Sequence, residues 1–213
     1  MELPGARNKI LQKIKQALKS PVPVPYPDQV ADTPIFIPTN HELTIDFAEK
    51  FTELLGKFVY CADESELVSQ LNALIKGHKW EKIYSREAGW LDDMAEYQFD
   101  PVTTDDLASC DAAITLCDHL VARTGTIVLS SQQLSGRTTS VYAPIHICIA
   151  YTHQLVFDIS DSLALFKKES SFMPSMITYA TGPSRTADIE KTLVVGIHGP
   201  KEVYCFLVDK LTD

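Results

Sequence analysis

Apolar and polar positions alternate along this chain with two different periods. Runs in which apolar residues recur every three or four positions predict amphipathic helices, whereas short apolar runs rich in β-branched residues predict strands. The expected helices lie at residues 7–19, 41–56, 64–77, 87–96 and in the second half of 154–167. The expected strands lie at residues 58–61, 82–85, 111–117, 126–130, 145–150, 176–180 and 203–208. Short strands that alternate with helices indicate an α/β domain, a three-layer sandwich around a mostly parallel sheet.

Two stretches depart from this alternation. A series of prolines follows the first helix, at Pro21, Pro23, Pro25, Pro27, Pro34 and Pro38. Because proline fixes φ and lacks a backbone donor, this stretch predicts a stiff extended linker. We therefore expect an N-terminal helix and linker at 1–38 and one α/β domain at 39–213. Between residues 126 and 150 two strands follow each other without a predicted helix, so part of the sheet is expected to be antiparallel.

Charge and hydropathy exclude several classes of function. The net charge of −9 disfavours sequence-independent nucleic-acid binding, which needs clustered Lys and Arg to neutralise phosphates. The basic residues of the first helix are interpreted as a solvated face. No run approaches the ~18 apolar residues of a membrane span, and the N-terminus lacks an apolar signal region. The sequence predicts a cytoplasmic protein without a membrane span.

The cysteines indicate free thiols rather than cofactor ligands. There are five of them, at Cys61, Cys110, Cys117, Cys148 and Cys205. The odd number argues against a disulfide framework, and no pair has the Cys-x-x-Cys spacing of many iron–sulfur sites. No spacing of His, Asp or Glu resembles a zinc or dinuclear site, and neither a glycine-rich dinucleotide motif nor a P-loop is present. We expect this chain to bind no metal and no nucleotide cofactor by itself.

Two polar loops next to apolar strands are the candidate binding elements. Thr124-Gly-Thr126 opens directly into a strand, and its glycine would let the backbone approach a ligand; the alternative is an ordinary turn. In the second loop, Gly182-Pro-Ser-Arg-Thr186, Arg185 offers a bidentate contact to a carboxylate or phosphate, with the hydroxyls of Ser184 and Thr186 beside it. The alternative is a local ion pair of Arg185 with Asp188 or Glu190.

Two histidines differ in their surroundings. His146 is inside an apolar strand, where a hydrogen-bonded core histidine is the ordinary interpretation. His198 lies in a Gly-x-His-Gly-Pro turn, where it could donate to a substrate carboxylate or act as an acid or base.

Longer stretches resemble a known family. Gly182-Pro-Ser-Arg-Thr-Ala-Asp-Ile-Glu190, followed by Gly196-Ile-His-Gly-Pro200, resembles the C-terminal signature of the lactate-utilisation protein C family, the LUD domain. Asp111-Ala-Ala with Thr124-Gly-Thr-Ile-Val-Leu129 is similar to its central motif, and Pro144-Ile-His-Ile147 to its Pro-x-His strand. The helix at residues 8–18 is also similar to the family's N-terminal helix. One position departs from the pattern, because Arg123 stands where the central motif usually has an acidic residue.

This resemblance implies a fold similar to the ribose-5-phosphate isomerase, glucosamine-phosphate deaminase and CoA-transferase superfamily. It also implies a non-redox subunit of a complex that oxidises L-lactate to pyruvate, with the iron–sulfur clusters on partner proteins. The alternative is a free-standing isomerase or acyl/CoA-transferase-like enzyme that acts on a small carboxylated or phosphorylated substrate. Acyl transfer through a covalent intermediate needs an accessible carboxylate, for which Glu190 and Asp188 are the local candidates.

The sequence predicts one anion-binding cleft formed by both loops. Ligands of α/β sheets bind beyond the carboxyl ends of strands, so the two loops are expected to face each other there. The expected ligand is a small carboxylate. Its binding residues would be Thr124, Gly125, Thr126, Gly182, Ser184, Arg185 and Thr186, with His198 at the rim, and the catalytic candidates are His198 and Glu190.

Overall fold

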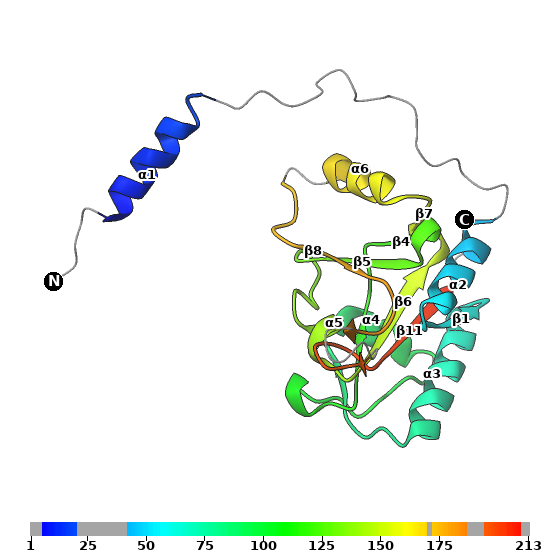
Figure 1. Cartoon of the computed structure of the whole chain (residues 1–213). Coiled ribbons are helices and arrows are strands. Elements are labelled where there is room, and N and C mark those ends of the chain that lie inside the picture. The colour runs from blue at the N-terminus through cyan, green and yellow to red at the C-terminus, as the bar shows by residue number, and fades with distance from the viewer. Residues whose placement is uncertain (1–5, 21–41, 170–171, 187–193, 210–213) are drawn as a thin grey trace. The chain divides into compact units, whose positions relative to one another are not determined.

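The protein is described from a computed structural model that covers residues 6–20, 42–169, 172–186 and 194–209 (Figure 1). The chain divides into two units, Met1–Pro38 and Thr39–Asp213, which are described separately. The first unit contains helix α1 (Ala6–Ala17), whose apolar side chains Ile10 and Ile14 are exposed. The larger unit contains all the other elements.

A fully parallel five-stranded sheet forms the centre of the larger unit. Its strands, in spatial order, are β1 (Lys57–Cys61), β11 (Glu202–Val208), β6 (Ile145–Tyr151), β3 (Ala112–Thr115) and β2 (Ile83–Ser85). The strands β6 and β11 are buried along almost their whole length. Continuous apolar runs are typical of parallel strands that are covered on both faces.

Two helices cover one face of this sheet. They are α3 (Glu64–His78) and α4 (Ala88–Ala95). The core between these helices and the sheet contains Leu67, Trp90, Ile114 and Phe206. A reciprocal cap starts α3, because Asp63 accepts the Glu66 backbone N–H at 2.8 Å and the Glu66 carboxylate accepts the Ala62 N–H at 2.8 Å.

Helix α2 (Leu43–Glu53) and a second sheet cover the opposite face. The second sheet has the order β7-β4-β5-β8, in which β5 is antiparallel to both of its neighbours. Its strands are β7 (Leu155–Val156), β4 (His119–Val121), β5 (Thr126–Ser130) and β8 (Ile177–Ala180). Phe47 and Phe51 of α2 pack with Ile127 of β5 against Cys148 and Cys205 of the parallel sheet. The antiparallel part predicted for residues 126–150 is thus a separate sheet.

Helix α6 (Ile159–Glu169) covers the outer side of the second sheet, as Figure 1 shows. Phe166 packs there against Val121 and Val128. The smaller elements are α5 (Thr139–Tyr142), the 3₁₀ helices η2 (Leu107–Ser109), η3 (Ala122–Thr124) and η4 (Thr152–Gln154), and the hairpin strands β9 (Arg185–Thr186) and β10 (Val194–Val195). Helix α5 lies between β5 and β6, where the sequence analysis expected no helix.

The predicted α/β class with a mostly parallel central sheet is confirmed. All five cysteines are buried and carry free thiols. Within the described ranges, no helix combines the length and the apolar character needed to cross a membrane.

Candidate functional site

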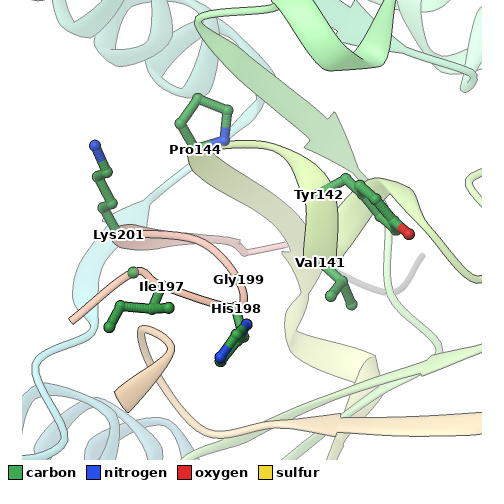
Figure 2. A pocket seen from close by; sticks show the side chains of 8 residues that line it. Val141, Tyr142, Pro144, Ile197, His198, Gly199 and Lys201 are labelled. Carbon is green, nitrogen blue, oxygen red and sulfur yellow. The ribbon is translucent and has the colours of Figure 1, made fainter. Parts of the chain in front are cut away.

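A cavity of about 470 Å³ lies at the amino ends of β6 and β11. Its walls come from α5, from the turn before β6 and from the loop before β11. The lining residues are Val141, Tyr142, Pro144, Gly196, Ile197, His198, Gly199 and Lys201. Figure 2 shows Lys201 and Tyr142 on opposite sides of this cavity, with Val141 beside Tyr142 and His198 between the two sides.

Backbone hydrogen bonds hold the loop of residues 196–201 in place. The Ser184 N–H donates to the Pro200 carbonyl at 3.0 Å, and the Gly196 N–H donates to the Ser184 carbonyl at 2.9 Å. The Lys201 N–H donates to the Pro144 carbonyl at 2.8 Å, which ties the start of β11 to the start of β6. A side chain at Gly199 would meet the Cβ of Ser184 at 2.9 Å, so glycine allows the two loops to approach each other closely.

A smaller cavity of about 170 Å³ adjoins the first. The two share Val141, His198 and Gly199 as lining residues. The other residues around the smaller cavity are Ser140, His146, Thr178, Ala180, Gly182, Ser184, Pro200 and Val203. The larger cavity therefore carries the lysine, whereas the described lining of the smaller one contains hydroxyls, two imidazoles and apolar groups.

His146 of β6 is the fully buried polar residue of this site. Its Nε2 lies 2.8 Å from the Oγ1 of Thr115 on the neighbouring strand β3. Its Nδ1 is buried and has no hydrogen-bond partner among the described residues. Burial lowers the pKa of His146 to about 4, so the ring is neutral near pH 7. The sequence predicts a hydrogen-bonded core histidine at this position, and the place of His146 on a cavity wall is the additional finding.

The arrangement suits a small anion that also forms hydrogen bonds. Lys201 supplies a positive charge, His198 an imidazole, and Ser140 and Ser184 hydroxyls. Within the described parts of the chain, no group of three or more His, Cys, Asp or Glu side chains is placed to hold a metal ion.

The structure brings together only part of the predicted binding set. Gly182, Ser184 and His198 line the smaller cavity. Arg185 is exposed on β9, pairs with Val195 of β10 and lines neither of the two cavities. Thr186 is on the same short strand. Glu190, like Asp188, lies outside the described residues. The binding or catalytic roles assigned to these residues stay predictions.

Residues 124–126 connect η3 to β5 and pack against α2. The Oγ1 of Thr126 lies 2.7 Å from that of Thr124 and 3.2 Å from that of Thr181. Thr126 thus contacts the residue directly before the second predicted loop, but residues 124–126 line neither cavity. Gly125 has a φ of +58°, and a Cβ there would lie 2.4 Å from the backbone nitrogen of Phe51. This glycine therefore permits close packing against a helix, and a binding role for residues 124–126 stays a prediction.

Arg123 forms an ion pair with Asp158, the residue before α6. Its backbone N–H also donates to the Phe157 carbonyl at 3.1 Å. The positive charge of Arg123, at the position where the family motif usually has an acidic residue, is therefore balanced by a carboxylate that lies between β7 and α6.

The cleft predicted at the carboxyl ends of the strands stays a prediction. The two described cavities lie instead near the amino ends of β6 and β11. The physical reason is the second sheet: β8 leads into the loop of residues 181–186, which reaches the start of β11 rather than its end. Lys201, Val141 and Tyr142 were missed, although a lysine directly after the His-Gly-Pro turn was a possible signal.

Comparison with known proteins relates this chain to one family. The model of the LUD domain matches residues 87–208, more than half of the chain. Lactate utilization protein C of Bacillus subtilis is 35% identical over 104 residues, which are 47% of this chain and 43% of that protein. The Bacillus licheniformis protein of the same name is 37% identical over 101 residues, 46% of this chain and 42% of that protein. An uncharacterized protein of Neisseria meningitidis serogroup B is 32% identical over 108 residues, 51% of this chain and 46% of that protein.

These alignments span less than half the length of the curated relatives. A crystal structure of a DUF162 family protein from Deinococcus radiodurans resembles the fold, with a TM-score of 0.55 at 20% identity, over 78% of this chain and 96% of that one. At this identity the likeness concerns the fold alone. The family model covers the region from α4 to β11, which includes both cavities, and this chain belongs to the LUD domain family.

Proposed function

We propose that this chain takes part in lactate utilisation and that it binds L-lactate, or a closely similar small carboxylate, in the cavities beside the loop of residues 196–201. The observation that carries the proposal is the similarity to several proteins named Lactate utilization protein C, at 35–37% identity over about half of the chain.

The chemistry of the two cavities supports a small carboxylate ligand. Lys201 offers one positive charge, which matches the single charge of lactate. The Ser184 hydroxyl and the His198 imidazole offer further hydrogen bonds to the same molecule. Most of the remaining wall is apolar or backbone, which is typical of sites for small ligands.

The oxidation of L-lactate to pyruvate removes two electrons, which need an acceptor. We propose that iron–sulfur proteins act as partners of this chain and take up these electrons, while the chain itself binds substrate without a redox centre. The free thiols are compatible with this division, because all five are buried and burial raises the pKa of Cys61 to about 11 and raises the pKa of Cys148.

Growth and co-purification test this role. Deletion of the gene from its host should abolish growth on L-lactate but not on glucose, and the wild-type gene should restore it. An affinity-tagged chain purified without oxygen should bring down proteins that contain iron and acid-labile sulfide. Normal growth on lactate together with purification free of iron–sulfur proteins would contradict the proposal.

Replacement of Lys201 tests the site. Lys201→Ala should weaken the binding of L-lactate about tenfold, the scale of one charge-assisted hydrogen bond. Lys167→Ala on α6, where the lysine is also exposed, is the matched control and should bind normally. Titration calorimetry measures both affinities. Turnover of sugar phosphates or acyl-CoA by the isolated chain would instead favour the isomerase or transferase alternative.

A further inference from the structure

We propose that the smaller cavity is a recognition subsite for an uncharged hydrogen-bonding group, the hydroxyl of a 2-hydroxy acid, and that His146 is its specificity-determining residue. The inference rests on the proposed function for the identity of the acid. It adds the division of the site into a charged part at Lys201 and an uncharged part at His146.

The first argument is the unpartnered nitrogen. His146 is 0% exposed, its Nε2 contacts Thr115, and its Nδ1 has no partner among the described residues. A buried polar atom without a partner costs about 1–3 kcal/mol. His146 is among the residues that line the smaller cavity. A bound group that reaches the buried Nδ1 through a small adjustment of this wall would form the missing hydrogen bond and remove that cost.

The smaller cavity suits an uncharged group. The described lining of the smaller cavity contains no Lys, Arg, Asp or Glu. Burial lowers the pKa of His146 to about 4, so this ring is neutral near pH 7. A carboxylate inside this cavity would be desolvated without a counter-charge, which is unfavourable. A hydroxyl needs only hydrogen-bond partners, and those are what the cavity contains.

The contact with Thr115 fixes the orientation of the His146 ring, because threonine has a stiff χ1 and lies on strand β3 of the parallel sheet. If the Thr115 hydroxyl donates to Nε2, then Nδ1 carries the proton and donates to the ligand; in the other tautomer, Nδ1 accepts from it. A ligand hydroxyl can take either role. The Ser140 and Ser184 hydroxyls on the same cavity walls provide additional partners.

The two cavities together select a class of ligand. They share the wall formed by Val141, His198 and Gly199, and Lys201 lines only the larger one. A carboxylate with a neighbouring hydroxyl would place its charge on the Lys201 side and its hydroxyl on the His146 side. Propionate has the same carbon skeleton as lactate without the hydroxyl, and it should therefore bind less tightly.

Ring ¹⁵N chemical shifts of His146 in the full chain test the subsite directly. The probes are L-lactate, propionate and 1,2-propanediol, which lacks the carboxylate. L-lactate and, at higher concentration, 1,2-propanediol should shift the Nδ1 resonance, whereas propionate should leave it nearly unchanged. If neither hydroxyl-bearing probe moves this resonance, the inference is overturned.

A variant measures the effect on selectivity. His146→Phe keeps an aromatic ring but cannot form the hydrogen bond, so L-lactate should bind about tenfold more weakly while propionate binding stays the same. His153→Phe at an exposed position is the control and should keep wild-type selectivity. Thr115→Val, which releases the ring, should reduce selectivity in the same direction and serves if His146→Phe does not fold. Unchanged selectivity in the folded variants contradicts the inference.

The failure of the proposed function would look different. In that case L-lactate would neither bind nor shift any resonance, while 1,2-propanediol would still shift Nδ1 of His146. This result would support the hydroxyl-binding subsite at His146 and contradict lactate as the ligand. Equal binding of lactate and propionate by the wild-type chain would instead contradict the subsite and leave lactate as a ligand.

Discussion

The buried imidazole of His146 links stability to pH at the scale of one residue. Burial disfavours its charged form, so its pKa falls from the ordinary value of 6.5 to about 4. The unfolded chain binds a proton below pH 6.5, whereas the folded chain does so only near pH 4. The contribution of this residue is therefore fully present above pH 6.5 and is lost as the pH falls towards 4.

We predict that this residue alone makes the protein about 2 kcal/mol less stable at pH 5 than at pH 7. Denaturant unfolding at both pH values measures the change in the wild type and in His146→Phe. Carboxylates titrate in both proteins, so the difference between their pH dependences isolates His146. The prediction fails if the two proteins lose the same free energy of unfolding.

Gly125 contributes to stability through its missing side chain. Its φ of +58° is costly for other residues, and a Cβ there would overlap the backbone of α2 at Phe51. Gly125→Ala should lower the free energy of unfolding by about 3 kcal/mol or more, because both costs apply.

Gly136→Ala is the matched control. Its φ is +62°, but its nearest neighbouring atom is 3.9 Å from the added Cβ, so only the backbone cost of about 1 kcal/mol applies. Similar losses in both variants would rule out the packing explanation.

Part of the candidate site was predictable at the scale of single residues. Gly125, Gly182, Ser184 and His198 were assigned to candidate binding loops, because glycine and polar residues next to apolar strands are recognisable from the local sequence. Gly125 was given a binding role because the contact with Phe51 joins positions more than 70 residues apart, which no local pattern reveals. The missing hydrogen-bond partner of His146 was not predictable either, because the sequence of an apolar strand does not show whether a cavity lies beside it.

At the scale of elements, an ion pair connects η3 to the start of α6. Arg123 binds Asp158, whose carboxylate also accepts the Ser160 backbone N–H at 3.1 Å. Burial by itself would raise the pKa of Asp158, but the hydrogen bonds from Arg123 and Ser160 outweigh this effect and lower the pKa below its ordinary value of 3.8. The pair therefore stabilises the fold above the ordinary pKa of an aspartate, and this contribution is lost as the pH falls through the lowered value.

A double-mutant cycle of Arg123→Ala and Asp158→Ala should give a coupling energy of about 1–2 kcal/mol, since both side chains are largely shielded from water. The cycle cancels the separate contribution that Asp158 makes to the start of α6 by accepting the Ser160 N–H. For comparison, the pair Lys50–Glu53 on α2 is 47% and 62% exposed, and it should give a coupling below about 0.5 kcal/mol. Equal couplings for the two pairs would contradict this prediction.

Helices and long strands were predictable, but their assembly into two sheets was not. The Asp63–Glu66 cap and the apolar periodicity of α3 are local signals, so the start of this helix was found correctly. Strands β4 and β7 have only three and two residues and are defined by pairing with distant segments. Without them the second sheet could not be recognised. The expectation that ligands bind at the carboxyl ends of the strands stays a prediction, and the two described cavities lie near the amino ends of β6 and β11.

At the scale of the whole molecule, the packed cores belong to the larger unit. Every residue of the hydrophobic clusters described here lies between Leu43 and Val208. In the first unit, α1 has Ile10, Leu11 and Ile14 exposed, at 60%, 43% and 49%. A unit with its own complete core is expected to fold independently of the preceding segment.

Deletion of residues 1–38 should therefore leave the fold and the ligand site unchanged. We expect the free energy of unfolding of residues 39–213 to lie within about 1 kcal/mol of that of the full chain, because no buried apolar cluster loses a member. Its affinity for L-lactate should also be that of the full chain, since both cavities are lined by residues 140–203. Denaturant unfolding and titration calorimetry on both proteins measure these quantities. If growth on L-lactate still requires residues 1–38 when fold and affinity are unchanged, this segment contributes neither to folding nor to ligand binding. Its amphipathic helix is then the part of the chain to test for binding to the proposed iron–sulfur partners. A truncated protein that unfolds or loses the ligand would instead show that the first unit is part of the folded domain.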